Sequence, residues 1–445
     1  MTLAPWIWRS LPLNERTGSE VFASLFLNHE TATLLESPYP ASPDYPQLGR
    51  FSICAGQPRT FWTPGIGEIL PFLTDLIQQK STSDAPEHLP FTGGWLGWLG
   101  YDLAWEIEKL PYLKADVLPF PVAFWYEPEC FAVLDHKEQV LWLAASSELQ
   151  LDQLEQANHC DILRVGSAFQ TEFCMSQTEY ETIVLKAKQH IQAGDIFQAN
   201  LSLRFEAKTG SDSWSIYRSL QSINPSPFSS YWKTPWGDVI SCSPERLVKL
   251  EHGIAETRPI AGTRPRGLTP ELDHQLEHEL LDNIKERAEH IMLVDLERND
   301  LGRVCEWGTV KVDELLVIER YSHVMHLVSN VVGRVRSHFT PVDVIRALFP
   351  GGTITGCPKV RCMEIVESLE PVRRSLFYGS CGFLDRRGNL DLNILIRTLL
   401  YVRSGEVATV WGQVGAGIVA DSDPEKEWFE SLQKARAQLA ALGTI

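Results

Sequence analysis

The sequence lacks several features, and each absence excludes a class of protein. It contains no apolar run long enough to cross a bilayer, and no basic start followed by an apolar segment. We therefore expect no signal peptide and a soluble, cytoplasmic protein. Positive charge is scarce, since the formal net charge is -17, which argues against nucleic acids and anionic membranes as partners. The GxxxxGK[ST] spacing of a phosphate-binding loop is also missing, so nucleotide binding is not supported.

Cysteines are present, but not in the spacing of a metal site. The nine cysteines form no CxxC or Cys/His motif, which indicates the reduced thiols of an intracellular protein. The 445 residues, 44% of them hydrophobic and 22% charged, are ordinary for a globular protein with two or three domains' worth of core. A polar stretch at 166–177 predicts a boundary, and we expect one domain over 1–165 and another over 175–440.

The hydrophobic pattern predicts more strands than helices, joined mostly in antiparallel fashion, and hence an α+β fold. Period-two segments predict strands that include 31–37, 51–56, 122–127, 131–135, 140–146 and 196–207. Helical spacing predicts helices at 66–80, 147–158, 177–193, 212–223, 270–299, 341–348 and 358–369, with one more that closes the chain.

The closing helix carries a pattern of charge on one face. We expect a flexible glycine-containing stretch (Gly415, Gly417) before it, with Asp423 as the N-cap and Pro424 as the first helical residue. Glu427, Glu430 and Lys434 follow at i, i+3 and i+7, which places two carboxylates and an ammonium on one side. Paired carboxylates suit a hard cation such as Mg2+, and the lysine suits an anionic substrate. A solvated helix face with an ordinary ion pair would have the same pattern.

A second charged helix repeats the carboxylate spacing. Glu286 and Glu289 lie at i, i+3, as Glu427 and Glu430 do. Two helices that each offer a carboxylate pair could close around one divalent cation. The alternative is a solvated acidic face beside Arg287.

Polar side chains interrupt three apolar segments that we expect to be strands. A histidine such as His326 is usually satisfied within a core, and Gln198 is uncharged. Arg397 is different, because burying a guanidinium without an anionic partner is prohibitive. It is therefore the best single pointer to an anionic ligand, and its forked donors fit a carboxylate. Glu245, after Pro244 at a strand start, has a reasonable position for a general acid or is an ordinary surface glutamate.

A glycine-rich turn leads into one of the expected helices. The segment is FPGGTITGCPK at 349–359, with Pro358 near the helix start. Backbone N–H groups at such a start bind anions.

Taken together, these motifs resemble the chorismate-utilising enzymes. The resemblance covers about 177–440 and rests on GDIFQANLS, SPERLVKL, ETRPIAGTRPRG, ERAEHIMLVDLERNDLGRV, HVMHLVS, PGGTITGCPKVRCMEIVESLEP, IRTL and GAGIVADSDPEKE. The first half, with LLES and FTGGWLGWLGYDL, is similar to the family's N-terminal domain more loosely. The implied fold is the anthranilate synthase component I-like sandwich of back-to-back antiparallel sheets flanked by helices, with the active site between the sheets.

The resemblance also implies roles for individual residues. The family's Mg2+ site, which binds the ring carboxylate of chorismate, would be formed by Glu286, Glu289, Glu427 and Glu430. Substrate carboxylates would be held, and the site lined, by Lys434, Arg397, the backbone of Gly415, Ala416 and Gly417, and the side chains of Thr353 and Tyr378. Glu245 matches the general acid that protonates the departing 4-hydroxyl, and His326 matches the family's active-site histidine.

The choice of nucleophile follows from one position. Gln198 stands where relatives that add water carry a basic lysine, which favours ammonia. Ammonia added at C4 leaves the enolpyruvyl group in place and gives 4-amino-4-deoxychorismate, for p-aminobenzoate and folate synthesis. Ammonia added at C2, with loss of pyruvate, gives anthranilate for tryptophan synthesis.

Two features point in different directions on the product. Members that aminate C4 commonly carry a nucleophilic lysine in a PIKGT motif, but this chain has Pro259-Ile-Ala-Gly-Thr263. The methyl group of Ala261 cannot form that covalent adduct, which favours anthranilate, or direct attack of ammonia at C4. The motifs PGGTITGCPK and GGWLGWLGYDL and the compact length favour C4 amination. Our prediction is C4 amination, with Ala261 and Thr263 counted among the catalytic positions.

The resemblance implies two further partners. The chain has no nucleophile-elbow cysteine with a histidine and a glutamate that would release ammonia, so we expect a separate glutamine amidotransferase subunit. LLES (Glu36, Ser37) and NPSPF (Pro227, Phe228) resemble a tryptophan pocket that serves feedback or holds a structural tryptophan; two ordinary turns are the alternative. A non-catalytic, tryptophan-binding scaffold is the competing class, but the acidic quartet with Glu245 and Arg397 argues against it.

Overall fold

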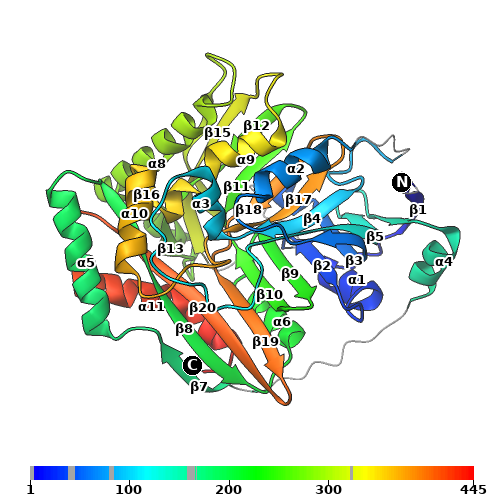
Figure 1. Ribbon diagram of the computed structural model, residues 1–445, viewed down its shortest axis with the longest axis horizontal. Helices are drawn as coiled ribbons and strands as arrows, with labels where there is room; N and C mark the ends of the chain where they lie inside the picture. The colour runs from blue at the N-terminus through cyan, green and yellow to red at the C-terminus, as the bar shows by residue number, and fades with distance from the viewer. Residues whose placement is uncertain are drawn as a thin grey trace.

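Figure 1 shows the computed structural model of the chain, which describes residues 5–38, 46–79, 85–157, 166, 168–320 and 324–444. The ends of the first expected domain, residues 1 and 165, lie outside this part of the chain, as do the last residues of the helices expected at 66–80 and 147–158. The domain boundary stays a prediction.

Runs of strands are separated by single helices or by pairs of helices along the chain. The strands are β1 (Ile7–Pro12), β2 (Ala32–Glu36), β3 (Phe51–Trp62), β4 (Gly94–Leu99), β5 (Ala123–Asp135), β6 (Val140–Ala145), β7 (Ala168–Phe173), β8 (Gln198–Thr209), β9 (Phe228–Thr234), β10 (Gly237–Ser243), β11 (Arg246–Glu251), β12 (Ile254–Thr257), β13 (Ile260–Pro265), β14 (Lys311–Arg320), β15 (Val324–Arg334), β16 (Gly356–Cys357), β17 (Ser380–Asp385), β18 (Leu390–Asn393), β19 (Thr398–Ser404) and β20 (Val407–Ile418). The α-helices are α1 (Gly18–Leu25), α2 (Ile69–Ile77), α3 (Ala104–Ile107), α4 (Glu148–Gln156), α5 (Gln177–Gln192), α6 (Ser213–Ile223), α7 (Pro270–Asp282), α8 (Ile284–Gly302), α9 (Pro341–Leu348), α10 (Lys359–Leu369) and α11 (Pro424–Ala441). Short 3-10 turns are η1 (Pro46–Gly49), η2 (Tyr101–Leu103) and η3 (Gly352–Ile354).

The long strand β5 joins two branches of antiparallel sheet. One edge of β5 pairs with β3, and the other edge pairs with β4 near its start and β6 near its end. From β3 the sheet continues through β2, β9, β10, β19 and β20 to β8. From β4 it continues through β17, β18, β11 and β12 to β15, which also pairs with β13 and β14. The expected α+β class with antiparallel sheets is confirmed.

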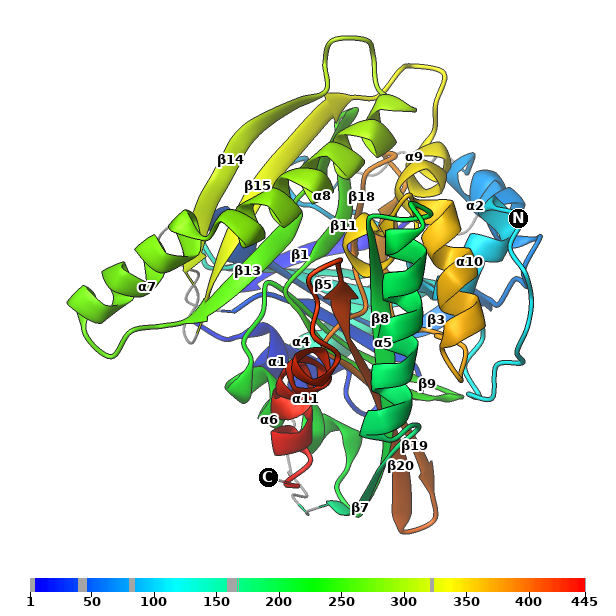
Figure 2. The ribbon, with the colours of Figure 1, turned by 90° about the vertical axis from the view of Figure 1, so that its left-hand side faces the viewer.

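Helices from distant parts of the chain cover the sheets where the two branches approach each other. Helix α11 packs on β20 and against α5 and α6, whereas α8 packs on β13 and β15. In Figures 1 and 2, α8 lies above α11, with β13 beneath α8 and β20 beside α11. The branches therefore bring α8, from the middle of the chain, near α11 at its end.

Four details of the sequence-based prediction were wrong. The charged helix expected over 270–299 is two helices, because Asn283 adopts an extended conformation and caps α8 by accepting from the Glu286 amide. The strands expected at 122–127 and 131–135 form the single strand β5. Arg397 lies between β18 and β19 with φ +51°, not within a strand. Gly415 and Gly417, expected in a flexible stretch, lie inside β20.

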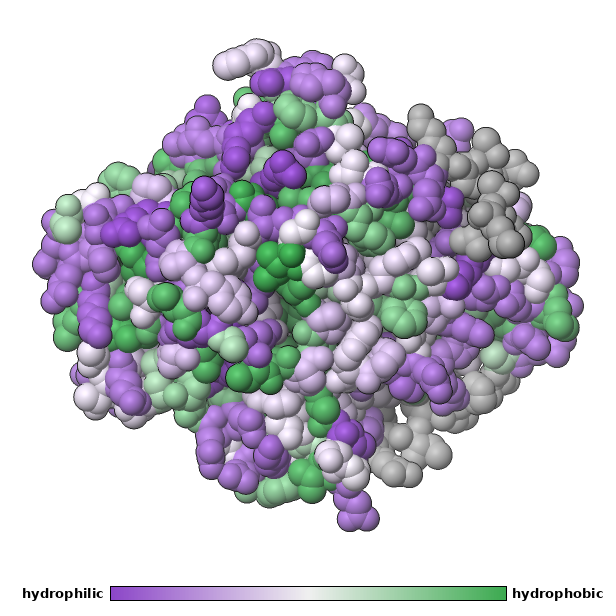
Figure 3. Space-filling model, viewed as in Figure 1, coloured by the Kyte–Doolittle hydropathy of each residue, from purple (hydrophilic) through white to green (hydrophobic). Residues whose placement is uncertain are grey.

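The surface and the interior separate residues as expected of a globular protein. Indoles gather inside, and Trp95, Trp98, Trp125 and Trp232 are fully buried. Hydrophilic and hydrophobic residues are interspersed over the face in Figure 3. Within the described ranges no helix is both long and apolar enough to cross a membrane, and the eight cysteines found there are free thiols.

Candidate active site

Arg397 is a desolvated cation without a matching anion. Burial lowers the pKa of its guanidinium, which shows that the surroundings disfavour the charge. In the described part of the chain no carboxylate forms an ion pair with it, and its side chain donates only to the main-chain carbonyl of Lys434, at 3.4 Å. Lys434 itself donates to the carbonyl of Gly415 at 2.9 Å and pairs with Glu430 at 2.9 Å. An anionic ligand would supply the missing charge.

Polar atoms without partners surround Gly415. A Cβ on this glycine would lie 2.9 Å from Asn200 Oδ1 and 3.0 Å from the Tyr378 hydroxyl. Both atoms are buried, and neither has a hydrogen-bond partner among the described residues. The amide of Asn200 is held by its donation to the Thr353 carbonyl at 3.3 Å. Buried polar groups are normally paired, so these two are candidates for ligand contacts.

Gln198 lies on the same wall, one strand away. A Cβ on Gly417 would approach Gln198 Nε2 to 2.4 Å, so only glycine leaves room for this side chain. Gln198 Oε1 is buried without a donor in the described structure. Strands β8 and β20 pair here, with Gly417 opposite Asn200. The register therefore places Gln198, Asn200 and the glycines of β20 together.

Glu245 is a carboxyl held in its protonated form. Its pKa is raised to about 8, mainly by burial and also by the charge of Glu297. Thr353 and the backbone of Ile260 act in the opposite direction. A carboxyl with this pKa carries its proton at neutral pH and can donate it. Ile260 directly precedes Ala261, so the acid lies beside the position that carries the lysine in the PIKGT motif.

His326 is a neutral imidazole paired with Thr263. Their side chains lie 2.9 Å apart, between Nδ1 and Oγ1, because β13 and β15 place these two residues opposite each other. Burial and the nearby Arg397 lower the pKa of His326 to about 4. A register shift between Ala261 and Thr263 of β13 leaves Gly262 with φ +67°. A Cβ on Gly262 would lie 2.6 Å from Glu286 Oε2. The bulge thus makes room for the carboxylate of Glu286.

The four expected metal ligands come in two pairs from α8 and α11, and Glu289 and Glu430 interact between the two helices. The charge of Glu430 raises the pKa of Glu289 and of Glu427, after the larger effect of burial in each case. The predicted pairing of Glu427 with Glu430 on one helix, capped by Asp423, is confirmed.

Three of these carboxylates form ion pairs within the described chain. Glu286 pairs with Arg264 at 2.9 Å. Glu289 also pairs with Lys285, and Glu430 with Lys434. Across the ranges that the structure describes, no three His, Cys, Asp or Glu side chains approach closely enough to hold a metal. The donor set nevertheless suits a hard cation, because Glu286 Oε2 and Glu427 Oε2 are buried without hydrogen-bond partners there.

Sequence reasoning missed a buried cluster behind Glu245. The Thr257 hydroxyl donates to Glu297 at 3.2 Å, and Lys359 donates to Asp300 at 2.6 Å. The signal was present in the charged run ERND, whose i, i+3 acids point inward. Lys359 opens α10, the helix start expected to bind an anion, and its ammonium is already paired there. Anion binding at that start remains a prediction.

A second missed residue is Arg374, which ties the wall of the site together. Its guanidinium donates to the carbonyls of Ile354 at 2.8 Å and Asn200 at 2.6 Å, and lies 4.7 Å from the centre of the Tyr378 ring. Glu370 neutralises it at 2.7 Å. Arg374 therefore links the backbone of Asn200 to that of Ile354, and its charge is paired with Glu370 and not with a ligand.

The four residues expected in an effector pocket do line one cavity. It measures about 340 Å³, and Glu36, Ser37, Pro227 and Phe228 share it with Arg50 and others. Glu36 is occupied within the chain, since its carboxylate accepts from Ser19, Tyr217 and Gln221. The Ser37 hydroxyl donates to the Pro227 carbonyl, which joins the two segments directly.

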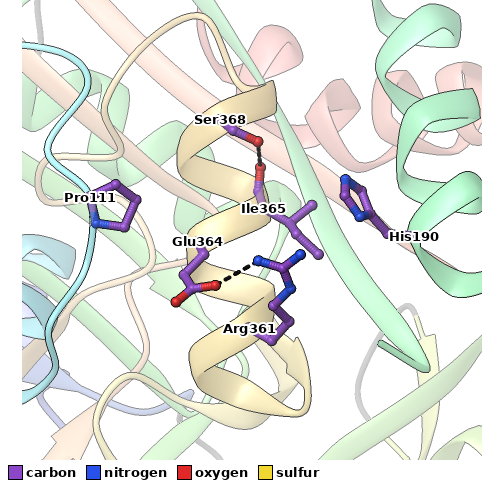
Figure 4. Close-up of a pocket in the computed structure, with 6 residues that line it drawn as sticks. All are labelled: Pro111, His190, Arg361, Glu364, Ile365 and Ser368. Atoms are coloured by element: carbon purple, nitrogen blue, oxygen red, sulfur yellow. Dashed lines mark hydrogen bonds and ion pairs between the residues drawn. The ribbon is translucent and has the colours of Figure 1, made fainter. Parts of the chain in front are cut away.

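Another cavity, of about 390 Å³, lies outside this arrangement. Figure 4 shows it between α5 and α10, with His190, Arg361 and Glu364 at its wall. Its charges are satisfied locally, because Arg361 pairs with Glu364 at 2.7 Å and both His190 and Arg361 contact Asp195. It contains none of the expected site residues.

The described site combines a half-buried guanidinium, a carboxyl with a raised pKa and two acidic helices. The model of the chorismate binding enzyme family matches residues 34–440, and the chain belongs to that family.

Three relatives are similar over most of their length. A Synechocystis "Anthranilate synthase component I-like protein" is 64% identical, over 99% of this chain and 93% of the relative. Aminodeoxychorismate synthase component 1 of Bacillus subtilis is 45% identical, over 82% and 80%. Anthranilate synthase component 1 of the same Synechocystis strain is 41% identical, over 88% and 83%. Among solved structures, anthranilate synthase component I of Streptococcus pneumoniae has 31% identity and a TM-score of 0.79, covering 91% of this chain and 94% of the other.

Proposed function

We propose that the protein aminates chorismate at C4 with ammonia, giving 4-amino-4-deoxychorismate, as an aminodeoxychorismate synthase component I. The observation that carries the proposal is the unpaired, desolvated guanidinium of Arg397 beside the Lys434 main chain. Chorismate carries two carboxylates. Arg397 can bind a carboxylate with two parallel hydrogen bonds, and Lys434 can bind one through its compact charge.

Glu245 supplies the acid that the reaction needs. A hydroxyl is a poor leaving group until it gains a proton, and Glu245 holds one at neutral pH because of its raised pKa of about 8. Ammonia forms the new C–N bond, the C4–O bond breaks, and Glu245 protonates the departing oxygen to give water. The added nitrogen releases one proton, so the atoms balance as chorismate plus ammonia giving the amine plus water.

The acidic quartet fits a magnesium ion. Glu286, Glu289, Glu427 and Glu430 would hold it, and the bound ion would supply positive charge to the ring carboxylate and draw electrons from the conjugated ring. The support is the mutual repulsion of Glu289 and Glu430, and the unpartnered oxygens of Glu286 and Glu427.

Two comparisons support C4 amination, whereas the name of the 64% identical relative, "Anthranilate synthase component I-like protein", supports anthranilate formation. Synechocystis has a protein named as anthranilate synthase component 1, yet this chain is more similar to a second protein of that strain, at 64% against 41%. The Bacillus subtilis aminodeoxychorismate synthase is also a nearer relative than that anthranilate synthase, at 45%. The second candidate is anthranilate formation, which Ala261 favours because the side chain offers no amine for a covalent intermediate.

Ammonia would come from a glutamine amidotransferase subunit. The cavity of Glu36, Ser37, Pro227 and Phe228 is our candidate site for tryptophan, either as inhibitor or as structural ligand. Calorimetry with tryptophan tests it, and absence of binding would remove that assignment.

The deciding experiment identifies the product. The chain is incubated with chorismate, Mg2+ and excess ammonium at mildly alkaline pH, and products are identified by mass and fluorescence. Aminodeoxychorismate that turns into p-aminobenzoate only when a lyase is added supports the proposal, whereas anthranilate with pyruvate replaces it by the second candidate. If no product forms and calorimetry detects no chorismate binding, the protein is a scaffold instead.

A further inference from the structure

Glu297 lies behind the general acid and contacts the two segments that flank it. Its carboxylate accepts from the Thr257 hydroxyl at 3.2 Å. Burial and the charge of Asp300 raise the pKa of Glu297, whereas Lys359, Thr257 and the backbone of Gly352 act in the opposite direction. Thr257 lies three residues before Ile260, and Gly352 directly precedes Thr353. The Thr353 side chain and the Ile260 backbone are the polar groups that act on the Glu245 carboxyl and lower its pKa. One carboxylate thus spans the β12 end and η3, which together form the cradle of the acid.

Glycine at 352 lets η3 approach α8 closely. A Cβ there would lie 2.3 Å from Leu296 Cδ2 and 3.4 Å from Glu297 Oε1, so a larger residue would displace the Leu296 side chain. The other end of the same loop is fixed by Lys359, which donates to Asp300 at 2.6 Å and to the Leu348 carbonyl at 2.9 Å. Glu297 and Asp300, one turn apart on α8, therefore hold the two ends of the loop between Gly352 and Lys359.

Glu297 is neither one of the proposed metal ligands nor one of the proposed substrate-binding residues. It is buried, and on α8 it lies eight residues beyond Glu289, the nearer proposed metal ligand on that helix. Its own charged neighbours are Asp300 and Lys359, and in its ionised form Glu297 raises the pKa of Glu245. A like charge nearby disfavours ionisation, so Glu245 keeps its proton to a higher pH than burial alone would achieve.

We propose that Glu297 is a positioning residue for the general acid: it fixes Ile260 and Thr353 around Glu245 and places a second negative charge beside that carboxyl. The inference rests on the proposed function, in which Glu245 protonates the leaving hydroxyl. It assigns to the ERND segment a role in the acid step and adds no group that touches substrate.

The test compares Glu297→Gln with the wild-type chain over a pH series at constant free ammonia. Glutamine keeps the size and removes the charge. Because the acid must be protonated, activity falls as pH rises through the pKa of Glu245, and we expect the basic limb of kcat/KM to move to lower pH by about one unit. Glu297→Asp, which retains the charge on a shorter arm, should restore the limb but not the full kcat. Asp295→Asn removes an exposed charge from the same helix and should leave the limb in place.

A readout without substrate separates this inference from the proposed function. The infrared band of the protonated Glu245 carboxyl, identified by its loss in Glu245→Gln, is titrated in the wild type and in Glu297→Gln. A lower midpoint in Glu297→Gln supports the inference whatever the product of the enzyme is. An unchanged midpoint and limb, with only a lower kcat, would overturn it. If Glu297→Gln does not fold, Thr257→Val removes the donor with little change in shape; it should shift the same limb in the same direction by less, and no shift counts against the inference.

Discussion

Arg397 donates to the main-chain carbonyl of Lys434 at 3.4 Å, while the Lys434 ammonium turns to the carbonyl of Gly415 at 2.9 Å. The two cations are thus anchored to backbone from different elements, α11 and β20, and only Lys434 is also neutralised, by Glu430. The positive φ of Arg397 places this side chain in the gap between β18 and β19. Under the proposed function, the pair would bind two anionic groups of one substrate.

Replacing Arg397 should separate binding from stability. In Arg397→Met we expect kcat/KM for chorismate to fall by about 10²-fold or more, the equivalent of roughly 2–5 kcal/mol, mostly through KM. The thermal midpoint should not fall, because the variant removes a half-buried charge that has no ion-pair partner in the described chain. Arg361→Met, at the cavity in Figure 4, serves as the control and should leave KM unchanged. Normal KM in Arg397→Met would contradict the assignment.

Glu289 should be needed for turnover but not for folding. Glu289→Ala removes one of four proposed magnesium ligands, so we expect loss of turnover and a weaker calorimetric response to Mg2+. Because burial and repulsion by Glu430 raise the pKa of Glu289, its removal should not lower the thermal midpoint without metal. Glu425→Ala, on the exposed side of α11, is the matched control. Wild-type turnover in Glu289→Ala would remove the metal assignment.

Glu245 should make stability depend on pH in a defined direction. Its pKa is about 8 in the folded chain and its ordinary value is 4.5. The folded state therefore binds the extra proton between these values, and the stabilising contribution is complete below pH 4.5 and is lost as pH rises through 8. Glu245→Gln should be inactive, yet its thermal midpoint should exceed that of the wild type at pH 8.5. The difference should vanish near pH 5; a difference independent of pH would contradict the raised pKa.

Local periodicity explains why part of the site could be predicted and part could not. The i, i+3, i+7 face of Glu427, Glu430 and Lys434 needs only helical spacing, and the structure has that face. The placement of Arg397 was wrong because an unbroken apolar run conceals a residue with positive φ between two strands. Glu297 was missed because its partners Thr257 and Gly352 come from elements distant in sequence. Spacing along one helix does not contain such contacts.

Ala261 provides the sharpest test of the chemistry at C4. It lies in β13 opposite Leu327, next to Ile260, whose backbone contacts Glu245. A methyl group offers no nucleophile, so the wild-type chain incubated with chorismate and no ammonium should show no added mass by intact-protein mass spectrometry.

Introducing an amine at this position should change that result. Ala261→Lys should gain the mass of a chorismate adduct that has lost water, since its amine would reach the ring beside the acid that releases the hydroxyl. Ala261→Met, of comparable length without an amine, controls for the larger side chain and should gain nothing. An adduct on the wild-type chain would mean that another side chain attacks the ring, and direct attack of ammonia would then be wrong.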